Sequence, residues 1–319
     1  MKKIINSCLL AVALFLAACS EDVNPNPELA GPLYGLQKGE PGSVDELIYN
    51  TWEHCGVHYI YDYEYYAFQV TNWSGYFNKY YTPVKEENKE VIRKVVTNIQ
   101  EGVFAGMDAD FIRRNWFVRV FLCDTLCDGY AYDEDDVVDT YMENQDMLII
   151  PNVGEKMKNF TDEDWAKWQT EFSNLLISRL YLGASEQPTA FFDLRFKNAN
   201  GKEATYFLTT VWEEDPEHRY SKNVYTFRTK GYIKSKPSSF QVETINVVDK
   251  QKDVADYINF LTTTTKEELD HNWSRFPLLL QRAKALIPYL GDVLGLDITA
   301  MQNANCPDDP VSADYFKNL

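Results

Sequence analysis

The fold is decided by residues 161–182, which read TDEDWAKWQTEFSNLLISRLYL. Thr161 is followed three positions later by Asp164, an approximate capping box of the kind that begins a helix. An apolar stripe then recurs at three- and four-residue spacing, formed by Trp165, Trp168, Phe172, Leu175, Leu176 and Leu180. The segment therefore predicts one long amphipathic helix whose stripe packs into the core.

Shorter elements flank this helix along the chain. Helical spacing of apolar residues predicts helices over residues 43–54, 86–100, 252–262 and 274–294, the last with Pro288 inside it. Alternation and turn signals predict strands over 57–68, 116–122 and 147–150, an irregular acidic stretch over 124–146, and a hairpin of 189–196 with 204–212 around Asn200-Gly201. No repeat and no linker interrupts residues 43–319, so we expect one α+β domain there.

The first 42 residues are expected to lie outside that domain. Lys2 and Lys3 precede an apolar run, 4–15, that is too short to span a bilayer and is typical of a signal peptide. Leu16-Ala-Ala-Cys19 then has the pattern of a lipoprotein cleavage site, although an ordinary signal peptide with a chance cysteine is the alternative. We expect residues 1–18 to be removed, Cys19 to be acylated, and the polar, proline-rich residues 19–42 to form a tether.

Charge and composition restrict the partners. The net charge of −17, with no basic cluster, excludes a nucleic-acid-binding protein, because the phosphate backbone would be repelled. A hydrophobic content of 45% is sufficient for a packed core. Four further cysteines, Cys55, Cys123, Cys127 and Cys306, could form disulfides after export or remain buried thiols, and their spacing does not choose between these.

Four stretches in order carry a resemblance to a known family. They are DELIYNTW at 45–52, MLIIPNV at 147–153, WQTEFSNL at 168–175, and GYIKSK at 231–236 with DVADY at 253–257. Together they resemble the zincin-like zinc-binding metallopeptidase lipoproteins, a family encoded beside outer-membrane nutrient-uptake systems. The resemblance covers nearly all of the mature chain and implies a zincin-like α+β fold. An acidic pair after Cys19 also resembles the export signal of outer-membrane surface lipoproteins.

The family's metal motif, His-Glu-x-x-His, is not conserved at the matching positions, which are Thr170, Glu171 and Asn174. Asp256 stands where the resemblance implies an acidic third ligand. A catalytic zinc needs imidazole nitrogens one helical turn apart, and neutral Thr and Asn oxygens are poor substitutes. We therefore expect no zinc cofactor and no catalysis by the family's route. Glu171 would be a relic of the general base or, as is more common, an ordinary helix carboxylate.

Other polar residues favour simpler interpretations. His54 and His58 have metal-like spacing, but Gly56 between them predicts a helix end and two partly exposed turn residues. His218 and His271 are expected in solvated loops. The acidic run 133–136 with Asp139 lacks the spacing of a calcium loop, so it is expected to be solvated.

The aromatic residues Trp73, Tyr76 and Phe77 suggest a loop that could bind a ligand or pack into the core. The sequence thus predicts a non-catalytic, lipid-anchored surface protein of the outer membrane. It would bind a peptide or glycan, or dock on a TonB-dependent transporter and its lipoproteins. An active zinc peptidase with an atypical metal site and a glycan-binding lipoprotein are the alternatives.

Overall fold

The chain divides into two compact units, residues 1–36 and 37–319, and only the second is described below. The computed structural model describes residues 35–63, 80–128, 132–143, 147–204, 206–208, 212–234 and 244–319. The segment expected to be a signal peptide, Cys19, most of the expected tether and the aromatic residues Trp73, Tyr76 and Phe77 lie outside the described residues.

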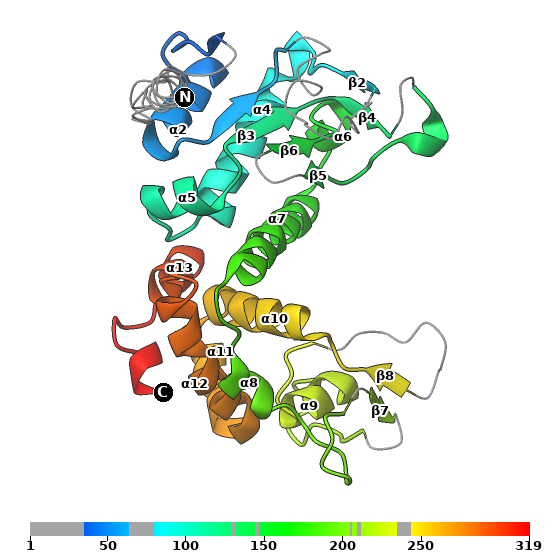
Figure 1. Cartoon of the computed structure of the whole chain (residues 1–319), viewed down its shortest axis with the longest axis vertical. Helices are drawn as coiled ribbons and strands as arrows, with labels where there is room; N and C mark the ends of the chain where they lie inside the picture. Colours follow the sequence, from blue (N-terminus) through cyan, green and yellow to red (C-terminus); the bar gives the residue numbers. More distant parts are fainter. Residues whose placement is uncertain are drawn as a thin grey trace, which may run out of the picture. The chain divides into compact units, whose positions relative to one another are not determined.

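Helices outnumber strands in the described part of the chain (Figure 1). The helices are α2 (Val44–Cys55), η2 (Glu86–Asn88), α4 (Lys89–Thr97), η3 (Asn98–Val103), α5 (Ala109–Asn115), η4 (Glu134–Asp136), α6 (Glu155–Lys158), α7 (Asp162–Gly183), α8 (Thr189–Asp193), α9 (Lys222–Thr229), α10 (Lys250–Thr263), α11 (Lys266–Arg275), α12 (Pro277–Asp292), α13 (Ile298–Asn305) and η6 (Phe316–Asn318). The strands are β1 (His58–Ile60), β2 (Tyr80–Thr82), β3 (Arg119–Leu122), β4 (Thr125–Cys127), β5 (Met142–Glu143), β6 (Met147–Ile150), β7 (Tyr206–Leu208) and β8 (Thr244–Asn246). The expected α+β class is confirmed.

The largest sheet has four strands in the order β1-β3-β6-β5. Its first three strands are parallel, with Val120 of β3 paired to Tyr59 on one side and Leu148 on the other, whereas β5 joins β6 antiparallel. Every residue of β6 is buried, as expected for an inner strand covered on both faces. The strand predicted at 147–150 is therefore confirmed.

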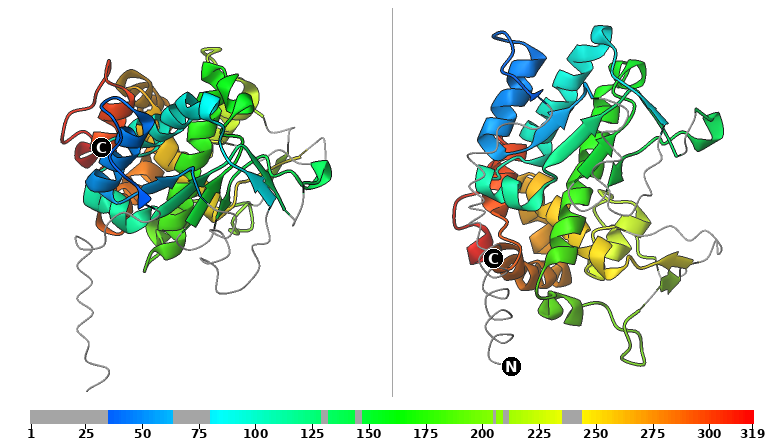
Figure 2. Two further views of the ribbon diagram at one scale, coloured as in Figure 1. Left: turned by 90° about the horizontal axis from the view of Figure 1, so that it is seen from above. Right: turned by 45° about the horizontal axis from the view of Figure 1, so that its top comes forward.

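Three helices form where helical spacing predicted them. α2 begins after Ser43, whose side chain accepts the Glu46 N–H, and ends at Gly56, which takes the left-handed conformation with φ 76°. The bounds of α7 and α10 differ from the predicted ones by at most two residues at either end. α7, green in Figure 1, contacts η3, α5 and α10. The helices α10 to α13, coloured yellow to red, lie together in Figure 2.

Several predicted boundaries are wrong because tertiary pairing overrides local pattern. The predicted hairpin is not formed: residues 189–193 are helix α8, and β7 pairs with the distant β8. Only the turn at Gly201 remains of it, closed by the bridge of Lys197 with Glu203. The supposedly irregular stretch 124–146 contains β4 and β5.

Other segments are shorter than predicted. The helix expected over 274–294 is divided at Phe276, because Pro277 begins α12 and disfavours helical backbone at the residue before it. The strand predicted over 57–68 is formed only by β1, and its residues 64–68 lie outside the described residues. The strand predicted over 116–122 begins at Arg119, and the helix predicted over 86–100 is η2, α4 and the π-helix η3 in succession.

The four cysteines left open by the sequence, Cys55, Cys123, Cys127 and Cys306, are buried free thiols. Among the described residues, no helix is both long and apolar enough to cross a membrane.

Candidate functional site

The N-terminus of α7 is fixed by a reciprocal cap. The Thr161 hydroxyl accepts the Asp164 N–H at 3.2 Å, and the Asp164 carboxylate accepts the Thr161 N–H at 3.0 Å. The predicted apolar stripe is buried, with Trp165 packed on Trp168 and Trp168 on Phe172 at ring-centroid distances of 5.5 and 4.3 Å. The rotation of α7 is thereby set, and this determines which residues face its neighbours.

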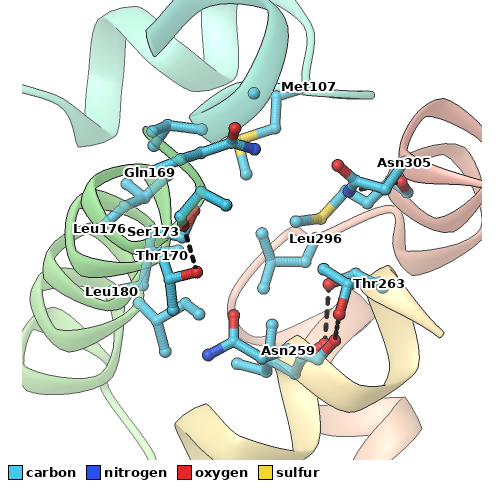
Figure 3. Close-up of a pocket in the computed structure, with 17 residues that line it drawn as sticks. Met107, Gln169, Thr170, Ser173, Leu176, Leu180, Asn259, Thr263, Leu296 and Asn305 are labelled. Atoms are coloured by element: carbon cyan, nitrogen blue, oxygen red, sulfur yellow. Dashed lines mark hydrogen bonds between the residues drawn. The ribbon is translucent and has the colours of Figure 1, made fainter. Parts of the chain in front are cut away.

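A pocket of about 260 Å³ opens beside this helix (Figure 3). α7 contributes one face to it, at helical spacing: Ala166, Gln169, Thr170, Ser173, Leu176, Ile177 and Leu180. The opposite walls come from η3 and Met107, from α10, and from Leu296 with α13. A Cβ at Gly102 of η3 would lie 2.4 Å from the side-chain carbonyl carbon of Gln169, so a larger residue there would displace the end of the Gln169 side chain.

The lining of this pocket is uncharged. Its described residues are Gly102, Val103, Met107, Ala166, Gln169, Thr170, Ser173, Leu176, Ile177, Leu180, Ile258, Asn259, Thr262, Thr263, Leu296, Met301 and Asn305. None of these is ionisable and none is aromatic, although charged residues are 25% and aromatic residues 14% of the chain. A charged ligand would lose its hydration without gaining a counter-ion, so the lining favours a neutral one.

Polar groups of the pocket are engaged to different degrees. The Thr170 and Thr263 hydroxyls donate to carbonyls of their own helices, Ala166 at 2.8 Å and Asn259 at 2.7 Å. The Asn305 amide likewise donates to the Met301 carbonyl at 2.9 Å. These groups therefore face the pocket mainly as acceptors, whose remaining lone pairs can receive a donor from a ligand.

Glu171 does not belong to this pocket. It follows Thr170 by one residue, about 100° around the helix, and does not line the cavity. Burial raises the pKa of Glu171 above its usual value, and the charge of Glu171 contributes to raising the pKa of Tyr141. None of the described lining residues of the pocket carries a carboxylate.

The other positions implied by the family resemblance serve different contacts. Asn174 accepts a hydrogen bond of 2.7 Å from the side-chain amide of Asn259, which joins α7 to α10. Asp256 is buried 3.5 Å from the ammonium of Lys252, and burial raises its pKa.

This donor set does not fit zinc. Thr170 and Asn174 offer neutral oxygens that are already hydrogen-bonded, without any imidazole. Within the described ranges, no three His, Cys, Asp or Glu side chains come together as a metal-binding group.

The histidines differ partly from expectation. His54 is exposed in the last turn of α2, as predicted, but His58 is a buried residue of β1 and not a turn residue. The apolar residues on either side of it, Val57 and Tyr59, are also buried, so the strand carries the imidazole into the core. Burial lowers the pKa of His58 to about 4.

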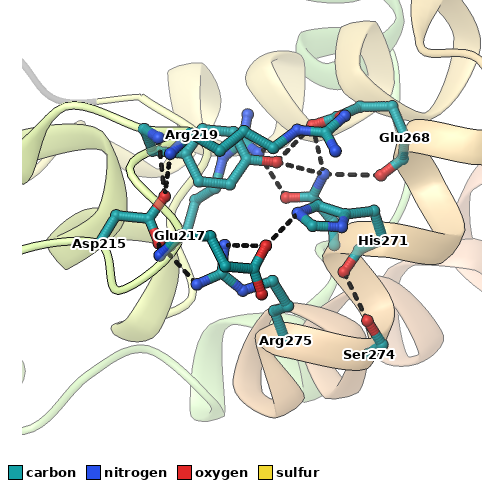
Figure 4. A network of polar contacts seen from close by, with 10 residues as sticks. Asp215, Glu217, Arg219, Glu268, His271, Ser274 and Arg275 are labelled. Carbon is teal, nitrogen blue, oxygen red and sulfur yellow. Dashed lines mark hydrogen bonds and ion pairs between the residues drawn. The ribbon is translucent and has the colours of Figure 1, made fainter.

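His271 is likewise not a loop residue. It lies half-buried on α11, with its Nε2 3.7 Å from the Glu217 carboxylate, in the network of Figure 4. Asp215 stands at the centre of that network, where it accepts the N–H groups of Glu217, Arg219 and Tyr220 and binds the Arg275 guanidinium at 2.6 Å. The Arg275 hydrogen bond holds the pKa of Asp215 well below its usual range. His218 is exposed, as predicted, and its N–H donates to the Asp215 carbonyl.

Sequence reasoning found only one residue of the pocket, Thr170. It missed Gln169, Ser173 and Asn259, which carry no motif of a known chemistry. The sequence does show that α7 and α10 each have a second face of neutral, small or polar residues. These residues recur at helical spacing at 166, 169, 170 and 173, and again at 259, 262 and 263.

No family model matches the chain, and no curated protein matches it. A solved structure similar to it is that of a "putative zinc-binding metallo-peptidase" from Bacteroides caccae, which is 12% identical, with 86% of this chain and 93% of that chain covered and a TM-score of 0.47. At this identity and TM-score the likeness assigns neither an activity nor a site to this chain.

Proposed function

We propose that this protein is a non-catalytic binding protein, a degenerate zincin-like domain held at the bacterial outer-membrane surface by lipid on Cys19. Its ligand site would be the pocket between α7 and α10, and the ligand an uncharged segment of a peptide. The anchored domain would act as an accessory to a TonB-dependent nutrient-uptake system.

The observation that carries this proposal is the chemistry of the pocket lining. All 17 described lining residues are uncharged, so they offer hydrogen-bonding groups and aliphatic surface but no carboxylate, imidazole or thiolate to act as a general acid, a general base or a zinc ligand. Aliphatic walls of Leu176, Leu180 and Leu296 suit an apolar side chain, and the thioethers of Met107 and Met301 can adapt to its shape.

A peptide is favoured over a glycan by the same lining. Sugar rings are usually held against aromatic faces, and none of the described lining residues is aromatic. The aromatic residues Trp73, Tyr76 and Phe77, which the sequence offers as a glycan-binding candidate, lie outside the described residues. Amide and hydroxyl groups in a row pair well with a peptide backbone.

Methionine methyl groups provide a direct test, since Met107 and Met301 line the pocket and Met142, Met147 and Met157 do not. The detergent-solubilised full chain, labelled with ¹³C at methionine methyls, is titrated with N-acetyl-leucine N-methylamide. We expect only the Met107 and Met301 signals to move, and to move far less with N-acetyl-leucine, which carries a carboxylate.

The proposal fails if the neutral probe leaves both pocket methionines unchanged up to its solubility limit. It also fails if the carboxylate probe binds as well as the neutral one, because an uncharged lining should discriminate between them. An oligosaccharide that shifts Met107 and Met301 in place of the peptide-like probe would favour the glycan alternative.

A further inference from the structure

The side chain of Asn259 is held by a partner outside the pocket. Its Nδ2 donates to the Oδ1 of Asn174 at 2.7 Å, and Asn174 does not line the cavity. In Figure 3 the amide oxygen of Asn259 accordingly points toward the pocket. The bond to Asn174 engages the donor end of the Asn259 amide, so its acceptor end faces the pocket.

The other polar groups on these walls reinforce that arrangement. The hydroxyls of Thr170 and Thr263 donate to backbone carbonyls of their own helices, and the Asn305 amide donates to the Met301 carbonyl. Acceptors therefore exceed donors in the part of the lining formed by α10, α13 and Thr170. Gln169 also lines the pocket, and its side-chain amide supplies both a donor and an acceptor.

We propose that the Asn174–Asn259 bridge makes the pocket selective for ligands that present N–H donors, with Asn174 as the positioning residue. This inference rests on the proposed binding of an uncharged peptide segment. It specifies that the site recognises the N–H groups of that segment. A backbone N–H satisfies the Asn259 oxygen, whereas an N-alkylated or ester-linked ligand leaves that acceptor buried without a partner. The position that the family resemblance assigns to a metal ligand thus orients a hydrogen-bonding group.

The test compares two neutral probes that differ in their N–H groups. N-acetyl-leucine N-methylamide has two, and N-acetyl-N-methyl-leucine N,N-dimethylamide has none. Titrations of the full chain, followed at the Met107 and Met301 methyls, give the ratio of the two dissociation constants. We expect the probe without N–H groups to bind about tenfold more weakly, which is the usual effect of leaving one buried acceptor unpaired.

Variants separate this discrimination from a difference in probe size. Asn259→Leu removes the acceptor and Asn174→Leu releases it to turn, so both should reduce the ratio toward one. Asn174→Asp keeps an acceptor for the Asn259 Nδ2 and should retain the ratio. Ser178→Ala is the matched control, since it removes another hydrogen bond between α7 and α10, from the Gln251 amide, at a residue outside the pocket.

The outcomes distinguish the two proposals. Binding of both probes with equal affinity overturns the donor selectivity and leaves the binding function intact. Loss of the ratio in Ser178→Ala, or its retention in Asn174→Leu, removes Asn174 from the positioning role. If neither probe moves the pocket methionines, the binding function itself is wrong.

Discussion

Two carboxylates one turn apart on α10 show how strongly the surroundings of a residue decide its role. Asp253 lies 2.6 Å from the Arg282 guanidinium and 3.4 Å from that of Arg195, and the side chains of the first pair are almost fully buried. Asp256 is also buried, but its one ion-pair partner in the described chain, Lys252, is half-exposed. Burial raises the pKa of both carboxyl groups, and for Asp253 the two guanidinium groups oppose the rise.

Replacing these carboxylates should therefore have unequal effects on stability. Asp253→Asn leaves the buried Arg282 guanidinium without a counter-charge and leaves Arg195 paired with Glu203 alone, and we expect it to lower the free energy of unfolding by about 3 kcal/mol. Asp256→Asn removes only a weak, partly solvated pair and should cost less than about 1 kcal/mol. Urea denaturation of the two variants measures the difference. Equal losses would show that the buried network contributes no special stability.

His58 should make stability depend on pH. Its pKa is about 4 in the folded chain, because burial disfavours the charged imidazole, and near 6.5 when unfolded. Between these values the unfolded chain binds the proton and the folded chain does not, so folding becomes less favourable as the pH falls from 6.5 to 4. The full effect is about 3 kcal/mol.

Comparison with His58→Leu isolates this contribution from the other titrating groups. The difference in unfolding free energy between wild type and variant should shift by about 3 kcal/mol against the wild type between pH 7 and pH 4. Chemical denaturation at several pH values gives that difference directly. A difference that stays constant with pH would mean that His58 is solvated in the folded chain.

At the scale of elements, α7 explains most of what could and could not be predicted. The capping pair and the stripe from Trp165 to Leu180 specify the helix and its buried face through local chemistry alone. The pocket face was not predictable in the same way, because Ser173 and Gln169 acquire their role only from η3, α10 and α13 on the other side. The prediction of a hairpin between residues 189–196 and 204–212 was wrong for the same reason, because β7 pairs with β8, a strand distant in the chain.

The cap of α7 can be tested by one substitution. Thr161→Ala removes the hydroxyl that accepts the Asp164 N–H, and we expect a loss of about 1 kcal/mol in the free energy of unfolding. Thr170→Ala is the control on the same helix. Its exposed hydroxyl bonds only to the carbonyl of Ala166, and alanine is the better helix former, so no loss is expected. A similar loss in both variants would contradict the role of the cap.

At the scale of the whole molecule, we propose a binding domain that is held at the membrane by lipid on Cys19. In cells expressing the full chain, we expect labelled palmitate to enter the wild type and Cys8→Ala but not Cys19→Ala. Cys8 lies inside the expected signal peptide and is a matched control for a second thiol near the N-terminus. Labelling that survives in Cys19→Ala would place the acyl chain elsewhere, and unlabelled wild type would mean that Cys19 is not acylated.

The central claim is that Thr170 and Asn174 of α7, at the positions where the family resemblance implies zinc ligands, do not hold zinc. Elemental analysis of the purified full chain, after equilibration with zinc and removal of loosely bound ions, tests it most directly. The neutral donors at Thr170 and Asn174 predict a zinc content well below one ion per chain, unchanged in Asp256→Asn. One tightly held zinc per chain, lost when Asp256 or Glu171 is replaced, would contradict it.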